Sequence, residues 1–211
     1  GIVYRSEQLA PVRRSVALKV LKSHDPKVMA RFRQELDALA AMEHENVARV
    51  LDSGDWEMRP FLALELVEDA RTLSEFCSAR ELGLNDRIRL FQQVCAGVQH
   101  AHQRGVIHRD LKPGNVLVSD TADGGTPKII DFGVARAMNP DGRLAATITR
   151  EGTPLGTPAY MSPEQARGSR DIDARTDVYS LGVMLFELVA GRRPFDERFA
   201  TAGSDAEIAE I

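Results

Sequence analysis

The chain has 211 residues, which is enough for one large domain or two small lobes with a buried core. Apolar residues make up 43% and charged residues 27%, and the formal net charge of −4 excludes the basic field of a nucleic-acid-binding protein. No apolar run reaches the length of a membrane span, no signal peptide pattern opens the chain, and the spacing of Cys77 and Cys95 indicates reduced thiols.

Residues 16–21 alternate with period two, which predicts a strand, and Lys19 shares one face of it with apolar side chains. Such a lysine is either a snorkelling edge residue or a charge held for a purpose. Asp25 and Pro26 predict the start of a helix that runs to about residue 42. Glu35 lies beside the apolar stripe of that helix, either in solvent or directed towards a cleft lined by the strand.

Further strands are predicted at residues 47–52 and 61–67, separated by the turn-rich Ser53-Gly54-Asp55. Residues 68–70 form a connector, and helical periodicity replaces strands after it. We place the boundary between a small strand-rich lobe and a larger helical lobe here.

An apolar face from Leu84 to Val98 predicts a long helix that ends near Gly105. The loop of residues 108–115 follows, and a turn at residues 123–125 joins short strands expected at 116–118 and 128–130. In this loop Asp110 can accept a proton, Lys112 can neutralise charge, and Asn115 offers an amide oxygen to a hard cation. The loop is therefore equipped for chemistry.

Residues 138–158 are polar and without periodicity, which is typical of a functional or mobile loop. From residue 177 to residue 190 nearly every side chain is apolar, so this helix is expected to be surrounded by others on all sides. Gly191 is expected to end the helix, and Pro194 to prevent its resumption.

A series of motifs follows in order along the chain: Val16-Ala17-Leu18-Lys19, Glu35, His108-Arg109-Asp110 with Asn115, Asp131-Phe132-Gly133, Ser162-Pro163-Glu164 and Asp177. Taken together, these motifs resemble the catalytic core of the protein kinases over nearly the whole chain. Residues 156–160, with Lys112, resemble the serine/threonine branch, and residues 11–19 and 161–166 resemble bacterial kinases at the head of multidomain proteins. The resemblance implies an α+β bilobal fold, with an N-lobe at residues 1–67 containing one main helix and a helical C-lobe at 68–211.

The resemblance implies a protein serine/threonine kinase that uses ATP and Mg²⁺, with Mn²⁺ as a substitute. Lys19 would contact the α- and β-phosphates and pair with Glu35, while Asp131 and Asn115 would hold the metal ion.

Three further residues complete the catalytic group that the resemblance implies. Asp110 would orient the substrate hydroxyl and accept its proton, and Lys112 would stabilise the transferring phosphoryl group. Thr157 would brace both of these side chains.

The resemblance also implies an adenine pocket, for which core packing is the alternative interpretation. Leu64 would lie behind the pocket, backbone groups of Glu65 and Val67 would bond the base, and three apolar side chains would sandwich it. These three are Val3, Ala17 and Leu117.

Arg109 directly precedes the catalytic-type aspartate, as in kinases that loop phosphorylation activates. The hypothesis is that a phosphate on Thr147, Thr149 or Thr153 pairs with Arg109 and Arg136 and orders the polar loop. The sequence does not select among the threonines.

The chain departs from the family pattern at both ends. Only the tail of the glycine-rich loop is present, and the later helices, one with the arginine partner of Glu164, are missing. We therefore expect the isolated chain to be unstable and weakly active. Ala70 and Ser162 replace commoner residues, but neither change removes a catalytic group.

Two competing functions are a pseudokinase scaffold and a small-molecule phosphotransferase. A scaffold has no physical need for the complete set of polar site residues, which are Lys19, Glu35, Asp110, Asn115 and Asp131. Residues 156–164 resemble a platform for protein substrates, which disfavours the small-molecule phosphotransferase. The expected partners are ATP and proteins with Ser or Thr hydroxyls, with self-association for autophosphorylation as an option. The domain is expected to be cytoplasmic, and membrane anchoring of the parent protein is left open.

Overall fold

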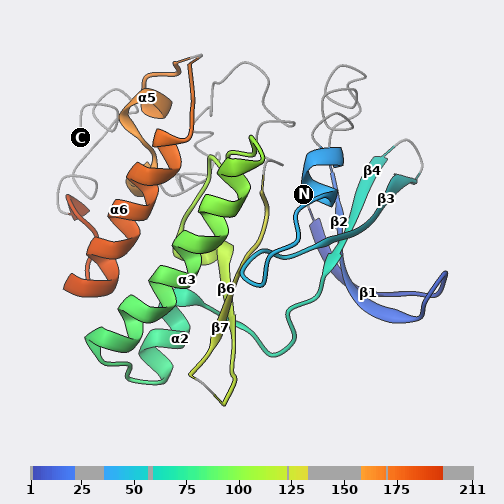
Figure 1. Cartoon of the computed structure of the whole chain (residues 1–211), viewed down its shortest axis with the longest axis horizontal. Helices are drawn as coiled ribbons and strands as arrows, with labels where there is room; N and C mark the ends of the chain where they lie inside the picture. The colour runs from blue at the N-terminus through green and yellow to red at the C-terminus, as the bar shows by residue number, and fades with distance from the viewer. Residues whose placement is uncertain are drawn as a thin grey trace, which may run out of the picture.

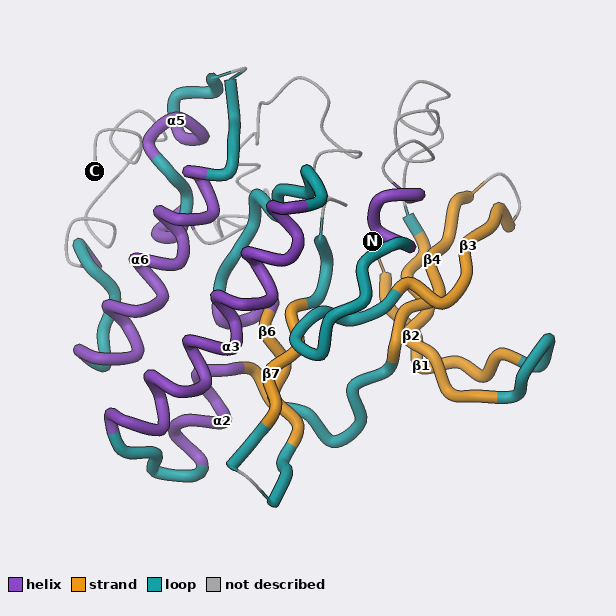
Figure 2. Tube along the Cα trace, viewed as in Figure 1, coloured by secondary structure: helices purple, strands orange, loops and turns teal. Residues whose placement is uncertain are grey.

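The computed structural model describes residues 2–21, 36–56, 59–122, 124–132, 158–169 and 171–196. A four-stranded sheet lies on one side of the molecule, with a short helical segment at residues 36–40 beside it, and the labelled helices lie on the other side (Figure 1). A three-stranded sheet, which contains β6 (Val116–Ser119) and β7 (Thr126–Ile129), lies between them (Figure 2). The expected α+β architecture, with a small strand-rich part and a larger helical part, is confirmed.

The larger sheet is antiparallel and has the order β1-β2-β4-β3. Its strands are β1 (Ile2–Gln8), β2 (Arg14–Val20), β3 (Val50–Trp56) and β4 (Arg59–Glu65). Lys19 of β2 lies opposite Val3 of β1 and Leu62 of β4, and Ala17 lies opposite Leu64. Because directly opposed and alternate residues share a face, these five side chains line one face of the sheet.

The turn expected at Ser53-Gly54-Asp55 is wrong, because these residues lie inside β3 and pair with β4. Gly54 leaves room for the ring of Phe61 on the neighbouring strand, because a Cβ on it would lie 2.8 Å from that ring and the ring would have to shift. The strand also begins at Val50 rather than at residue 47. Val47 instead forms an isolated parallel bridge to Ile129.

The helical part begins with β5 (Arg71–Thr72) and α2 (Leu73–Ala79), whose start is fixed by a capping box between Thr72 and Glu75. The long helix predicted from residue 84 is α3 (Leu84–Gln103). A 3₁₀ turn, η1 (Pro113–Asn115), leads from the loop at residues 108–115 into β6. The predicted strands at 116–118 and 128–130 are confirmed, although the second begins two residues earlier and ends one residue earlier than expected.

Three elements follow the polar loop: η2 (Pro158–Tyr160), α5 (Pro163–Ala166) and α6 (Arg175–Ala190). Gly191 ends α6 with a φ of 70°, as expected. The expectation that α6 is surrounded on all sides is wrong, since Val178, Phe186 and Val189 are 60%, 40% and 52% exposed.

One hydrophobic cluster joins the two parts of the molecule. Leu39 and Met42, on either side of the end of a helical segment at residues 36–40, pack with Leu90 and Val94 of α3 and with Phe132. Residues 25–35 of the helix predicted to start at Asp25 lie outside the described residues. Among the described helices, none is both long and apolar enough to cross a membrane.

Candidate active site

Lys19 is the buried cation of the four-stranded sheet. Its strand, β2, lies between β1 and β4, and the residue is 9% exposed. Its Nζ atom lies 2.7 Å from Oδ1 of Asp131, which follows the strand β7 of the smaller sheet. A lysine that snorkels from a sheet edge would be solvated, so this geometry supports the other interpretation, a charge held for a purpose.

The loop between α3 and β6 concentrates polar groups around Asp110. Lys112 Nζ donates to both carboxylate oxygens of Asp110, at 3.1 and 2.8 Å. Asn115 Nδ2 donates to the carbonyl of Asp110 at 2.7 Å and to its Oδ2 at 3.1 Å. The carbonyl of Asn115 accepts the N–H of Ile130, the residue before Asp131, so the two polar loops lie next to each other.

The side chain of His108 links the loop of Asp110 to the segment that precedes Asp131. The imidazole is fully buried; its Nε2 bonds the carbonyl of Ile130 at 2.9 Å, and its Nδ1 accepts the N–H of Asp110 at 3.2 Å. It packs edge-on against Phe132, with ring centroids 4.7 Å apart. These partners require the neutral Nε2–H tautomer, and burial lowers the pKa of His108.

Acidification is therefore expected to destabilise the protein between pH 7.5 and pH 5.5. The unfolded chain protonates His108 near its ordinary pKa of 6.5, while the folded chain resists protonation, so the unfolded state binds more protons as pH falls. The melting temperature should therefore fall as the pH is lowered across this range, and it should fall less steeply in His108→Gln.

His100 provides the comparison, because burial, Arg104 and His44 lower its pKa in the same direction. Since His100 is only partly buried, His100→Gln should flatten the profile less than His108→Gln. An unchanged slope in His108→Gln would contradict this role for the buried imidazole.

Asp177 of α6 holds the backbone of the catalytic-type loop. Its carboxylate is completely buried, and it accepts the N–H of His108 and the N–H of Arg109, both at 2.8 Å. His102 Nε2 lies 2.7 Å from the same carboxylate. The sequence motif included Asp177, but its role was not predicted, because its partners lie 68 and 69 residues away in the chain.

Glu65 ends β4 and faces the smaller sheet. Its carboxylate contacts Lys128 Nζ at 3.0 Å and the N–H of Arg49 at 3.2 Å. Because the N–H of Glu65 donates to the carbonyl of Arg49 at 2.9 Å, any backbone bond from Glu65 to a base would use its carbonyl. Leu117 lies opposite Lys128 in the β6–β7 register, so the two side chains lie on the same face of the smaller sheet.

The structure brings together most of the predicted site residues but does not describe all of them. Val3, Ala17 and Leu64 lie on the Lys19 face of the sheet, and Val67 is half-buried just beyond β4. The remaining predicted residues lie outside the described part of the chain. They are Glu35, Arg136, Thr147, Thr149, Thr153 and Thr157.

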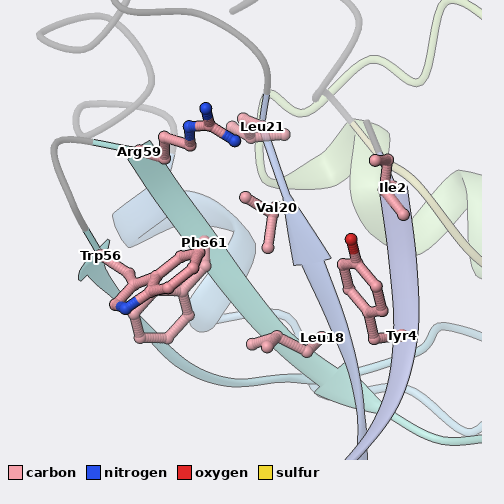
Figure 3. Close-up of a pocket in the computed structure, with 8 residues that line it drawn as sticks. All are labelled: Ile2, Tyr4, Leu18, Val20, Leu21, Trp56, Arg59 and Phe61. Carbon is pink, nitrogen blue, oxygen red and sulfur yellow. The ribbon is translucent and has the colours of Figure 1, made fainter.

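A separate apolar cavity of about 500 Å³ lies on the other face of the sheet (Figure 3). Leu18 and Val20, the neighbours of Lys19 on β2, point into it, so it is distinct from the polar group at Asp131. Its lining residues are Ile2, Tyr4, Leu18, Val20, Leu21, Trp56, Arg59 and Phe61.

The donor set at Asp131 and Asn115 fits a hard divalent cation. Because Asn115 uses Nδ2 to bond Asp110, its amide oxygen is left for a ligand. Among the described residues, Asp131 pairs with Lys19 through Oδ1 only. In the described ranges no group of three or more His, Cys, Asp or Glu is arranged to hold a metal ion, but one or two protein oxygens suffice when substrate phosphates complete a magnesium site.

A family model for the protein kinase domain matches residues 1–210. The chain therefore belongs to the protein kinase domain family, which confirms the resemblance seen in its motifs. Its relatives include the serine/threonine-protein kinase pkn2 of Myxococcus xanthus, 40% identical over 200 residues, which are 93% of this chain and 23% of that protein.

Two more relatives are also bacterial. The probable serine/threonine-protein kinase PknB of Lactococcus lactis is 38% identical over 204 residues, 95% of this chain and 31% of that protein. The serine/threonine-protein kinase PrkC of Bacillus subtilis is 35% identical over 204 residues, 95% of this chain and 30% of that protein. The chain thus spans about a quarter to a third of these curated relatives.

Proposed function

We propose that this chain is the catalytic domain of a protein serine/threonine kinase that transfers the γ-phosphoryl group of Mg·ATP to protein hydroxyls. The contact between Lys19 and Asp131 carries the proposal, because it joins the sheet to the loop beside Asp110 and Asn115. The names of the bacterial relatives support the serine/threonine class.

Phosphoryl transfer depends on positioning and on charge neutralisation, and the chain's residues divide these tasks. Lys19, fixed on a central strand, binds the α- and β-phosphates, and Glu35 pairs with it in the complex. Asp131 and Asn115 hold Mg²⁺, or Mn²⁺ in its place. The metal ion, when bound, neutralises charge on the phosphate oxygens.

Asp110 and Lys112 act at the acceptor hydroxyl. The carboxylate of Asp110 orients the substrate Ser or Thr and receives its proton at one of the oxygens that Lys112 now contacts. The ammonium group of Lys112 moves to the transferring phosphoryl group when substrate binds, with Thr157 bracing both side chains. The direct Lys112 contact with both oxygens supports this pairing of roles.

The base of ATP lies against the same sheet face as Lys19. Val3 and Ala17 cover one side of the ring, Leu117 covers the other, and Leu64 closes the back. The carbonyl of Glu65 and the backbone of Val67 bond its polar edge. Support comes from the strand register, which places Val3, Ala17 and Leu64 on the Lys19 face.

In this proposal residues 1–67 form the N-lobe and residues 68–211 form the C-lobe. Phosphate on Thr147, Thr149 or Thr153 pairs with Arg109 and Arg136, which couples activity to autophosphorylation between copies of the protein. Phosphosite mapping of active protein that finds none of the three threonines modified would exclude this regulation.

Phosphate transfer from ATP to the protein itself and to a generic basic protein tests the function. The complete protein should incorporate phosphate in a Mg²⁺-dependent way, and Asp131→Asn should reduce incorporation by at least about a hundredfold, because it removes a metal-binding charge. Equal incorporation by the two proteins would contradict the role of Asp131.

Glu68→Gln is the matched control for this experiment. Glu68 is an exposed acid whose described partner is Arg5, at 3.3 Å, so Glu68→Gln removes the same charge from a surface ion pair and leaves the Lys19–Asp131 pair in place. Its incorporation should equal that of the unmodified protein. If the unmodified protein binds ATP but transfers nothing to either acceptor, a scaffold function replaces the proposal.

A further inference from the structure

Gln165 is a buried amide that bridges two segments of the site. It lies on α5 and is only 6% exposed. Its Oε1 accepts the N–H of Ser162 at 3.0 Å, and its Nε2 donates to the carbonyl of Arg109 at 2.6 Å. Because one partner is a donor and the other an acceptor, the orientation of the amide is fixed by chemistry.

The peptide group between Arg109 and Asp110 is held at both ends. Gln165 bonds its oxygen, and His108 Nδ1 accepts its N–H at 3.2 Å. The N–H of Arg109 donates to Asp177 at 2.8 Å. Three side chains from different parts of the chain therefore determine the backbone directly before Asp110.

This backbone is in a conformation that needs such support. Arg109 has a φ of 69°, in the left-handed region that non-glycine residues rarely adopt. A conformation of this kind persists when the surrounding structure imposes it. If the bond from Gln165 were lost, the carbonyl of Arg109 would have one restraint fewer, and the adjoining Asp110 could turn with it.

Gln165 also faces the segment that precedes α5. A narrow cavity between the Asp110 loop and the segment of Tyr160 and Met161 has Gln165 in its wall. Through the bond to Ser162, the same amide fixes the end of this segment. A single side chain therefore bonds both segments.

We propose that Gln165 is a positioning residue for phosphoryl transfer, which it serves by fixing the Arg109–Asp110 peptide and coupling it to residues 158–162. The inference rests on the proposed kinase function. A primary amide supplies both the donor for Arg109 and the acceptor for Ser162, whereas a carboxylate lacks the donor and an apolar chain lacks both.

Two variants of the complete protein test this role. Gln165→Glu keeps the size and the acceptor but loses the donor, and Gln165→Met keeps the approximate size alone. Both should lower the kcat of the folded protein by about tenfold or more, because Asp110 is misdirected, while the Kd for ATP stays close to that of the unmodified protein. Both should also melt earlier, because buried groups lose a partner, so kcat is compared at a temperature at which every variant is fully folded.

A pH profile separates positioning from packing. In Gln165→Glu the introduced carboxyl can donate to the Arg109 carbonyl once it is protonated, and burial favours protonation. The ratio of its kcat to that of the unmodified protein should therefore rise between pH 8 and pH 6. The same ratio for Gln165→Met should stay flat, because methionine does not titrate.

Ser162→Ala is the matched control. Its hydroxyl bonds Thr176 at 2.5 Å and caps α5, but its removal leaves the Ser162 N–H and the Gln165 bond to Arg109 intact. Ser162→Ala should keep kcat within about twofold of the unmodified protein, even though loss of the cap lowers its melting temperature.

The proposal is overturned if both Gln165 variants keep kcat within twofold. It is also overturned if kcat falls only in proportion to the folded fraction, because Gln165 would then act through general stability. An unmodified protein that transfers no phosphate contradicts the kinase function instead, so the two failures are distinguishable.

Discussion

Replacement of Asp110 by asparagine is expected to lower kcat by roughly 10²- to 10⁴-fold, the range that general acid–base groups contribute. Asparagine has nearly the same shape but cannot accept the proton of a substrate hydroxyl. The ATP Kd should change by less than about threefold, because the proposed mechanism assigns Asp110 to the acceptor hydroxyl rather than to the nucleotide. Single-turnover phosphate transfer at saturating ATP measures the effect.

Asp120→Asn is the control for this change. Asp120 is a half-exposed carboxylate paired with Arg80, remote from the site in the described structure, and its loss removes the same charge. A kcat for Asp110→Asn within about threefold of the control would contradict the assignment of Asp110 as the proton acceptor.

Asp177→Ala is expected to destabilise the protein by about 3–5 kcal/mol, the largest stability effect of any single change considered. The substitution removes the acceptor of two backbone N–H groups, on His108 and Arg109, in a fully buried position. Unpaired buried donors keep their full desolvation cost. Chemical denaturation should show an earlier midpoint, accompanied by loss of phosphate transfer.

Asp171→Ala provides the comparison for the stability measurement. Its side chain is exposed and has no described side-chain partner, so the denaturation midpoint should stay near that of the unmodified protein. If Asp177→Ala behaves like Asp171→Ala, the buried carboxylate does not organise the loop.

The strands and helices with strong periodicity could be predicted from the sequence. The alternation around Lys19 predicted β2, and the apolar face from Leu84 predicted α3 nearly to the residue. The turn predicted at Ser53-Gly54-Asp55 was wrong because turn-forming composition is a local signal, whereas in β3 Gly54 leaves room for the ring of Phe61 on the neighbouring strand. This close approach appears only when the strands are paired.

The site could be predicted as a set of residues but not as a network. Motifs identified Lys19, Asp110, Asn115 and Asp131, and two of these now lie 2.7 Å apart. The bonds that fix the loop backbone, from Asp177 and Gln165, connect residues 56 to 69 positions apart. No local pattern encodes these distances, so neither role could be derived from the sequence.

A crystal structure of the protein with Mg²⁺ and a non-hydrolysable ATP analogue tests the central claim most directly. We expect Lys19 Nζ to contact the α- and β-phosphates, Asp131 and the Asn115 amide oxygen to bind the metal ion, and the base to lie against Val3 and Ala17. A nucleotide bound in the apolar cavity of Figure 3, or phosphates remote from Lys19 and Asp131, would contradict the account.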